Sequence, residues 1–272
     1  MKVLGRILKY LIIFLLCFIV LLPFLWTLYA ASVTNDLDLG SSLLKTDKYG
    51  IDNFIYILTK GDVWIWFKNS IFVVTVITAL NLLINTMAGY ALAQFRFKGR
   101  QIFFLYVTGI MMIPAQVLVI PIFLVSSNLG ITNSYLGLIL PFIYNPFGVF
   151  LMRQYFLSFP KEIVEAAEID GLGVYSSFFH IVLPLAKNAL MTQTILIFVW
   201  NWNSFMLPST LVNDPALYTL PLGMYQITNT QYVTSVPKAM AGAALTLIPT
   251  IIFYLIFQKK LINSDMGTAV KG

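Results

Sequence analysis

Charged side chains are scarce in this sequence. Only 10% of its 272 residues are charged, whereas 59% are hydrophobic. Soluble globular domains carry about 25% charged residues, so the composition excludes an ordinary soluble domain. It predicts an integral membrane protein.

Groups that carry enzyme chemistry are also scarce. The sequence has one histidine, His180, and one cysteine, Cys17, so it offers no Cys/His cluster for a metal. It lacks the G-x-x-x-x-G-K-[ST] phosphate loop and a serine in a nucleophile elbow. These absences predict a chain that is not an enzyme, hydrolyses no ATP itself and binds no metal or cofactor. Cys17 lies in an apolar run, where we expect a small buried hydrophobic side chain.

What the sequence does contain is long apolar segments. A helix of roughly 20 residues crosses a hydrocarbon core of about 30 Å, and six segments are long enough. They are residues 10–32, 69–93, 102–125, 135–156, 188–208 and 239–258. The first follows basic residues as a signal peptide would, but its apolar run exceeds the usual signal core, so an uncleaved anchor is expected. We treat residues 1–272 as a single helical membrane domain.

Acidic side chains are missing from all six segments. Proton-coupled transporters usually place a titratable carboxylate or histidine inside the membrane, so this absence disfavours a secondary transporter. Sodium coupling through carbonyl and hydroxyl oxygens stays open.

The distribution of Lys and Arg predicts the orientation, because cytoplasmic loops are enriched in both. With both termini on one side, that side carries twelve of the seventeen basic residues. They are Lys2, Arg6, Lys9, Arg96, Lys98, Arg100, Arg153, Lys161, Lys187, Lys259, Lys260 and Lys271. The termini are therefore expected in the cytoplasm. This asymmetry accounts for the net charge of +6, so no nucleic-acid partner is inferred.

Two of the predicted spans carry polar faces that must point away from lipid. Spacings of three and four place Thr78, Asn81 and Asn85 on one face of the second span. The fifth span carries Gln193, Thr194, Trp200, Asn201 and Ser204 on about a third of its circumference.

These faces have two interpretations. In the first, the polar faces line a pathway for a neutral, hydroxyl-rich solute. Amide groups can donate to and accept from its hydroxyl groups, and an aromatic ring can cover the apolar face of a sugar ring. Alternatively, the polar groups form hydrogen bonds between helices.

The loop of residues 157–187 stays out of the membrane and is predicted to form two short helices. Pro160 and Glu162 suit a helix start, and Gly171 and Gly173 suit its end and a tight reversal. The second helix, near Val174 to Val182, is predicted to place Ser176, Ser177 and His180 on a polar stripe opposite Val174, Phe178, Ile181 and Val182. His180 is expected to face solvent.

The first of these helices is unsuited to an anionic membrane surface. It presents the acids Glu162, Glu165, Glu168 and Asp170 against a single Lys161. Small residues lie on several sides, and alanine lets a partner backbone approach closely. We therefore expect it to dock in a groove of another protein.

The same loop resembles a known signature. "EAAEIDGLGVYSSFFHIVLP" is similar to the EAA motif of permease subunits of binding-protein-dependent ABC importers. The motif positions are filled by Glu165, Ala166, Ala167, Gly171, Ile181, Leu183 and Pro184. The resemblance implies that the loop, with Asp170, supplies the coupling helix that docks on an ATP-binding subunit.

More of the chain resembles the carbohydrate branch, specifically its maltose-type smaller permease. The similar stretches are "NSIFVVTVITALNLLINTMAGYALAQFRFKG", "LGITNSYLGLIL", "EIDG", "WNWNSFMLP" and the tail "GTAVKG". The resemblance runs from about Asn69 to the end, and the first span matches only in character. One departure is "WNWNSF", where relatives commonly carry an acidic residue after W-N.

The family implies six spans, cytoplasmic termini and a bacterial or archaeal cell membrane. It also implies a second permease subunit, two ATP-binding subunits that hold ATP and Mg, and an extracytoplasmic solute-binding protein. The expected solute is a sugar. A polyol or glycerol phosphate is the alternative solute, although no basic residue lies in the outer half of the spans to favour an anionic one. An ion-coupled secondary transporter is the alternative class of protein.

Overall fold

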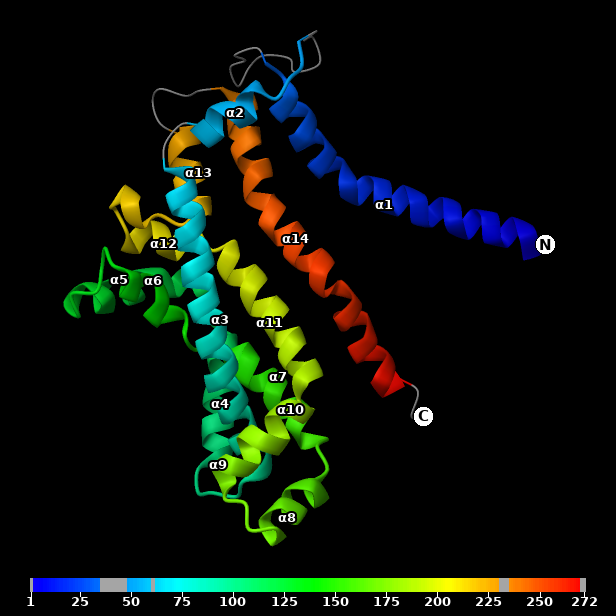
Figure 1. Ribbon diagram of the computed structural model, residues 1–272, viewed down its shortest axis with the longest axis vertical. Helices are drawn as coiled ribbons and strands as arrows, with labels where there is room; N and C mark the ends of the chain where they lie inside the picture. Colours follow the sequence, from blue (N-terminus) through cyan, green and yellow to red (C-terminus); the bar gives the residue numbers. More distant parts are fainter. Residues whose placement is uncertain (1, 35–47, 60–61, 230–234, 270–272) are drawn as a thin grey trace. The chain divides into compact units, whose positions relative to one another are not determined.

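The computed structural model describes residues 2–34, 48–59, 62–229 and 235–269 (Figure 1). The described residues are almost entirely helical, and the only β-type pairing among them is an isolated bridge between Val33 and Tyr49. The all-helical fold is therefore confirmed. Lys271, which entered the orientation argument, lies outside the described residues, as does the end of "GTAVKG".

The chain divides into two compact units. Unit 1 comprises Met1–Trp66 and Leu220–Pro249, and unit 2 comprises Phe67–Thr219 and Thr250–Gly272. The first segment of unit 1 contains α1 (Lys2–Ser32), α2 (Asp52–Thr59) and the first residues of α3 (Val63–Gln94). Its second segment contains α13 (Leu220–Asn229) and the first part of α14 (Val236–Ala269). Both α3 and α14 continue from unit 1 into unit 2 along the chain.

Within unit 1, α2 is a short helix between α1 and α3. The Asn53 side chain holds it, because Asn53 Nδ2 donates to the carbonyl oxygens of Ala31 (2.9 Å) and Val33 (2.7 Å) at the end of α1. Gly223 of α13 lies against the Trp66 indole so closely that a Cβ there would collide with the ring.

Unit 2 contains the remaining helices, several of them short. They are α4 (Arg100–Met111), η2 (Ala115–Leu118), α5 (Val119–Asn128), α6 (Tyr135–Ile139), η3 (Leu140–Phe142), α7 (Pro146–Leu157), α8 (Lys161–Ile169), α9 (Val174–Ser177), η4 (Phe178–Val182), α10 (Leu183–Leu185), α11 (Lys187–Trp202), α12 (Met206–Leu211) and η5 (Pro215–Leu217).

Four stretches among the described residues are long and apolar enough to cross a membrane. They are Gly5–Ser32, Val63–Gln94, Tyr135–Leu157 and Val236–Gln258. The count rises to as many as six if each of two bent helix pairs forms one span. The six predicted segments therefore correspond to this upper count.

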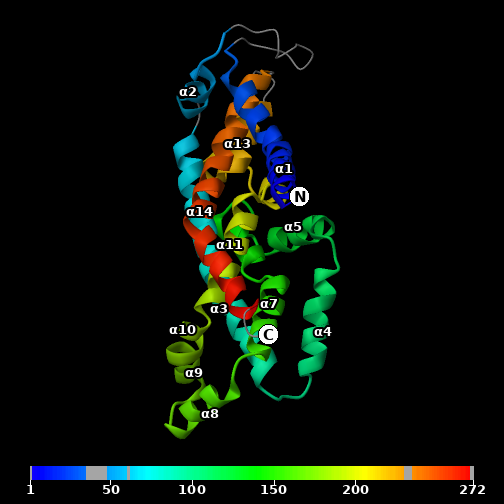
Figure 2. The same cartoon turned by 90° about the vertical axis from the view of Figure 1, so that its right-hand side faces the viewer.

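The segment predicted as a third span is not one continuous helix. It consists of α4 and the η2–α5 stretch, bent by 96° (Figure 2). Pro114 lies at the break with φ −58° and ψ 129°. Proline lacks an amide hydrogen and disfavours helical geometry in the residue before it, so the helix ends and restarts here.

The fourth and fifth predicted segments also depart from straight helices. In the fourth, Asn145 Oδ1 accepts from Gly148 N (3.1 Å) and Pro146 occupies the first position of α7, so a new helix starts inside the segment. In the fifth, α11 ends at Trp202, and the predicted extension to Pro208 belongs to α12.

Candidate functional site

The loop after α7 is anchored on a hydrophobic core of unit 2. Tyr90 of α3, Phe156 of α7 and Phe178 of η4 are buried, and both phenylalanine rings lie 5.2–5.4 Å from the Tyr90 ring. Ile163 and Val164 of α8 pack against this cluster. The apolar arc of α8 is therefore used within the chain, which fixes the direction of its other face.

That other face of α8 is open. Glu162, Glu165 and Ala166 are exposed, and so is Asp170 just beyond the helix. Ile169 is 85% exposed beside these acids. An exposed isoleucine within an acidic surface is suited to burial against a protein rather than to solvent.

Gly171 fixes how α8 ends. Its φ is +81°, in the left-handed region, and Leu172 N donates to Ala167 O (3.0 Å). This six-to-one bond across a left-handed glycine is a Schellman motif, and the helix ends at the glycine as predicted. A Cβ at Gly171 would touch nothing within 4 Å, so the backbone conformation, and not space, requires glycine here.

The second half of the loop differs from the predicted helix. Phe178–Val182 forms a π-type turn, so the stretch from Val174 is not a regular α-helix and its sides do not follow the 3.6-residue period. Ser177 is buried and Val174 is exposed, so the predicted polar stripe was wrong for both residues. His180 is exposed as expected, and its Nδ1 donates to Ser176 O (2.9 Å).

The predicted docking residues separate into two groups. Glu165, Ala166, Asp170, Gly171 and Pro184 are exposed. Ala167 is 2% exposed, and Ile181 and Leu183 are half-buried, with Leu183 packed on the core. The second group supports the surface that the first group forms.

Sequence reasoning missed two apolar residues of this surface. Neither Ile169 nor Tyr175, which is 73% exposed, was named among the docking residues. The sequence did contain a signal for them, because a large apolar residue that lies outside every predicted apolar face is expected to be exposed.

The polar residues of α3 lie inside unit 2. Asn81 and Asn85 are at most 1% exposed. Asn81 Nδ2 donates to the carbonyl oxygens of Ile77 (3.0 Å) and Phe142 (2.5 Å), and Asn85 Nδ2 donates to Asn81 Oδ1 (3.2 Å). Asn85 Oδ1 accepts from Asn145 N (3.4 Å). These bonds connect α3 to the break in the chain between η3 and α7, as expected if the polar groups form hydrogen bonds between helices.

Gly148 brings three helices together. A Cβ on this α7 residue would collide with Asn85 Nδ2 of α3 and would lie 2.6 Å from Gln193 Nε2 of α11. Gln193 is 2% exposed, and neither polar atom of its amide has a partner among the described residues. An unsatisfied buried amide is costly, so Gln193 is the polar side chain of this cluster with bonding capacity left for a solute or water.

The end of α11 forms a separate group. Trp200 is 47% exposed and meets Phe147 edge-on at 5.5 Å, while Asn201 Nδ2 donates to Ile197 O (2.8 Å). Ser204 lies beyond the helix, because its N–H bonds to Asn201 O (3.2 Å) and tightens the last turn. It was therefore wrongly placed on the helical face. The neighbouring Trp202 is buried against Phe198 and belongs to the core.

No group of three or more His, Cys, Asp or Glu that could hold a metal occurs in the part of the chain that the structure describes. The fold defines a multi-pass helical membrane protein. The chain belongs to the family described as "Binding-protein-dependent transport system inner membrane component", which matches residues 85–263. The resemblance of the loop to the permease signature is thereby confirmed at the level of the family.

Three relatives show the range of this family. The chain is 41% identical over 223 residues to the arabinooligosaccharides transport system permease protein AraQ of Halalkalibacterium halodurans, covering 82% of this chain and 80% of the relative. It is 30% identical to the trehalose/maltose transport system permease protein MalG of Thermococcus litoralis, covering 100% and 99%. It is 34% identical to the sn-glycerol-3-phosphate transport system permease protein UgpE of Yersinia pestis, covering 70% and 68%.

A solved structure has the same fold. The chain aligns, with a TM-score of 0.80, with a chain from the crystal structure of a bacterial ABC transporter involved in the import of the acidic polysaccharide alginate. The alignment covers 95% of this chain and 96% of the other at 24% identity. The expected permease fold is confirmed.

Proposed function

We propose that this chain is a membrane-spanning subunit of an ATP-driven importer and forms half of the pathway for a sugar. Family membership carries the importer assignment, and two of the relatives described above are named for oligosaccharide or disaccharide transport. The absence of acidic residues from the predicted spans is consistent with transport driven by a partner and not by protons.

The exposed face of α8 is the observation that carries the coupling mechanism. Ile163 and Val164 commit one side of α8 to the core of unit 2, so Glu165, Ala166 and Ile169 are presented outward on a fixed helix. We assign this face to an ATP-binding subunit. When ATP closes two such subunits, α8 moves with them and biases the spans between inward-facing and outward-facing states.

The proposed assembly contains a second permease subunit, two ATP-binding subunits with ATP and Mg, and an extracytoplasmic solute-binding protein. This chain hydrolyses no ATP and holds no cofactor in the proposal. It resides in a bacterial or archaeal cell membrane with both termini in the cytoplasm, as the excess of basic residues on that side supports.

The proposed solute path uses a subset of the polar residues. Gln193 retains bonding capacity, Trp200 exposes an aromatic face, and Asn201 lies beside it. Asn81 and Asn85 are already bonded within unit 2, so we assign them to support of the path. Ser204 is retained only as a neighbour at the end of α11.

Charge reversal on α8 tests the coupling role. Glu165→Lys should remove the ATP-binding subunit from the purified complex and abolish solute uptake, while membrane insertion is unchanged. Because Glu165 is exposed, the substitution breaks no packing within this chain. Asp62→Lys is the matched control, since it makes the same change of charge at an exposed site outside the loop. Normal uptake and normal retention of the ATP-binding subunit in Glu165→Lys would contradict the assignment.

The solute class has one supported alternative, a polyol or glycerol phosphate, because the UgpE relative is named for sn-glycerol-3-phosphate. Binding of sugars, polyols and glycerol phosphate to the cognate solute-binding protein decides between them. An ion-coupled secondary transporter is the remaining alternative, and uptake driven by an ion gradient in vesicles without nucleotide would establish it.

A further inference from the structure

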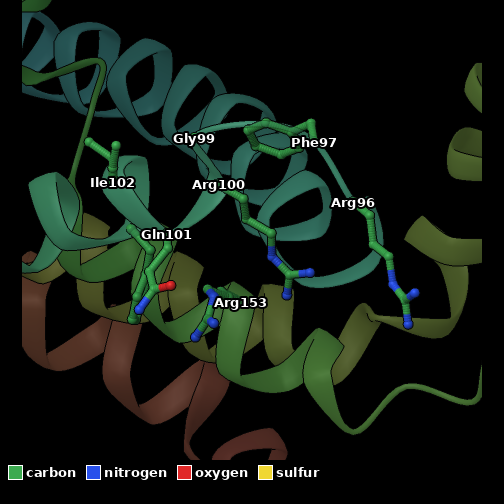
Figure 3. Close-up of a pocket in the computed structure, with 8 residues that line it drawn as sticks. Arg96, Phe97, Gly99, Arg100, Gln101, Ile102 and Arg153 are labelled. Carbon is green, nitrogen blue, oxygen red and sulfur yellow. The ribbon is translucent and has the colours of Figure 1, made fainter.

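A pocket lined by three arginines lies between the loop that joins α3 to α4, the first residues of α4, and α7. Its volume is about 840 Å³, and no Asp or Glu contributes to it. It is lined by Arg96, Phe97, Gly99, Arg100, Gln101, Ile102, Phe104 and Arg153. Figure 3 shows the polar ends of Gln101, Arg100 and Arg153 pointing the same way.

Two of the arginines are held in place by the chain. Arg100 donates to the carbonyl oxygens of Ala93 (3.2 Å) and Phe95 (3.3 Å), and Arg153 lies 3.7 Å above the centre of the Phe104 ring. These contacts use only part of their hydrogen-bonding capacity, since each guanidinium has five donors. Arg153 Nε is buried and has no partner among the described residues.

The start of α4 adds backbone donors to the same pocket. Gly99, with φ +87°, precedes the helix and provides no side-chain cap. Arg100 N and Phe103 N bond to Phe97 O and Gly99 O. The N–H groups of Gln101 and Ile102 bond to no described residue, so two donors remain at the positive end of a 12-residue helix. Such a helix start favours an anion.

Guanidinium groups, an amide and helix-start N–H groups together match the oxygens of a phosphate. We propose that this pocket binds a phosphate group, and that its source is the headgroup of an anionic phospholipid. The site is separate from the exposed face of α8 and goes beyond the proposed transport function.

The surroundings favour lipid over free phosphate. The pocket opens beside apolar α4 residues that unit 2 leaves uncovered: Ile102 is 74% exposed, Leu105 70% and Tyr106 65%. These side chains continue along one of the apolar segments expected in the membrane, so acyl chains can pack beside them while the headgroup enters the pocket. The loop before Arg100 joins two such segments, which places the pocket at a membrane face.

The test uses the complete importer complex in lipid nanodiscs of phosphatidylcholine with a minor fraction of phosphatidylglycerol. Native mass spectrometry counts the phosphatidylglycerol molecules retained per complex. Arg96→Gln combined with Arg153→Gln should weaken retention roughly fivefold for each arginine removed. Arg100 is left unchanged because it also caps α3.

Lys98→Gln is the matched control, because Lys98 is exposed in the same loop but does not line the pocket. It should retain lipid as the unaltered chain does. Equal retention in the double variant would overturn the proposal. Displacement of the lipid by millimolar inorganic phosphate would overturn the lipid source, whereas resistance to it supports that source. Loss of the ATP-binding subunit from the double variant with lipid retention unchanged would make the pocket a protein contact.

Discussion

Two charged regions of opposite sign lie at the same end of unit 2 (Figures 1 and 2). The acids of α8, represented by Glu165 and Asp170, stand exposed on a helix whose apolar side is buried. The arginines around the start of α4 line a pocket, and Arg153 is half-buried with an aromatic ring beneath it.

The difference concerns what each region can contact. An exposed acidic helix with a protruding Ile169 matches a broad protein groove, and an anionic membrane surface would repel it. A recessed arginine pocket beside uncovered apolar side chains matches a single anionic headgroup. The two proposals therefore assign a protein partner to the acidic region and a lipid partner to the basic pocket.

The largest effect is expected at Gly171. Gly171→Pro forces φ to about −65°, which the observed φ of +81° does not allow, so the end of α8 must rearrange. Solute uptake and retention of the ATP-binding subunit should be lost, while lipid retention by the arginine pocket persists. Gly171→Asn is the control, because asparagine tolerates the left-handed region and the space is open. Simultaneous loss of lipid would show that the two regions are not independent.

A smaller effect is expected at Ile169. Burying an isoleucine side chain is worth about 1.5–3 kcal/mol, so Ile169→Ser should weaken binding of the ATP-binding subunit about tenfold or more. The chain itself should keep its stability, because Ile169 is 85% exposed within it. Titration of the purified ATP-binding subunit onto the membrane complex measures the change. Ile169→Leu is the control and should keep the affinity of the unaltered chain. Unchanged affinity in Ile169→Ser would remove this residue from the docking surface.

The smallest effect is expected at Phe104. Phe104→Leu removes the aromatic ring and with it a cation–π contact worth about 0.5–1 kcal/mol at a partly exposed site, so phosphatidylglycerol retention should fall about two- to fivefold. Phe103→Leu is the control, because Phe103 is 59% exposed and does not line the pocket. Binding of the ATP-binding subunit should not change in either variant. An equal loss of lipid in both variants would point to a general effect of α4 on the membrane.

Local signals predicted much of the exposed loop. Neighbouring residues determine helix ends and surface charge, and Glu165, Asp170 and Gly171 are exposed as predicted, whereas Ala167 is 2% exposed. The burial of Asn81 and Asn85 also followed from their spacing. Ser177 could not be placed this way, because the π-type turn after it depends on how Phe178 packs against Tyr90 and Phe156 from distant helices.

The broken helices were only partly predictable. Pro114 and Pro146 marked the positions, but proline is tolerated in straight membrane helices whenever neighbours compensate. The break before Pro146 also involves contacts from a distant helix, such as the Asn81 side chain on the Phe142 carbonyl. The arginine pocket was not foreseen, since Arg96, Arg100 and Arg153 had been counted only for orientation, and Arg153 is more than fifty residues further along the chain.

The bend at Pro114 limits how far α4 reaches across the hydrocarbon core of the membrane. A helix of 12 residues such as α4 rises about 18 Å, which is little more than half of a hydrocarbon core of about 30 Å. Since α5 turns away by 96°, α4 alone does not cross the hydrocarbon core, and lipid tails or another helix must occupy the remaining depth. A single-chain miniature of this transporter would therefore need an added hydrophobic segment at that depth, or the surrounding bilayer would have to thin to meet it.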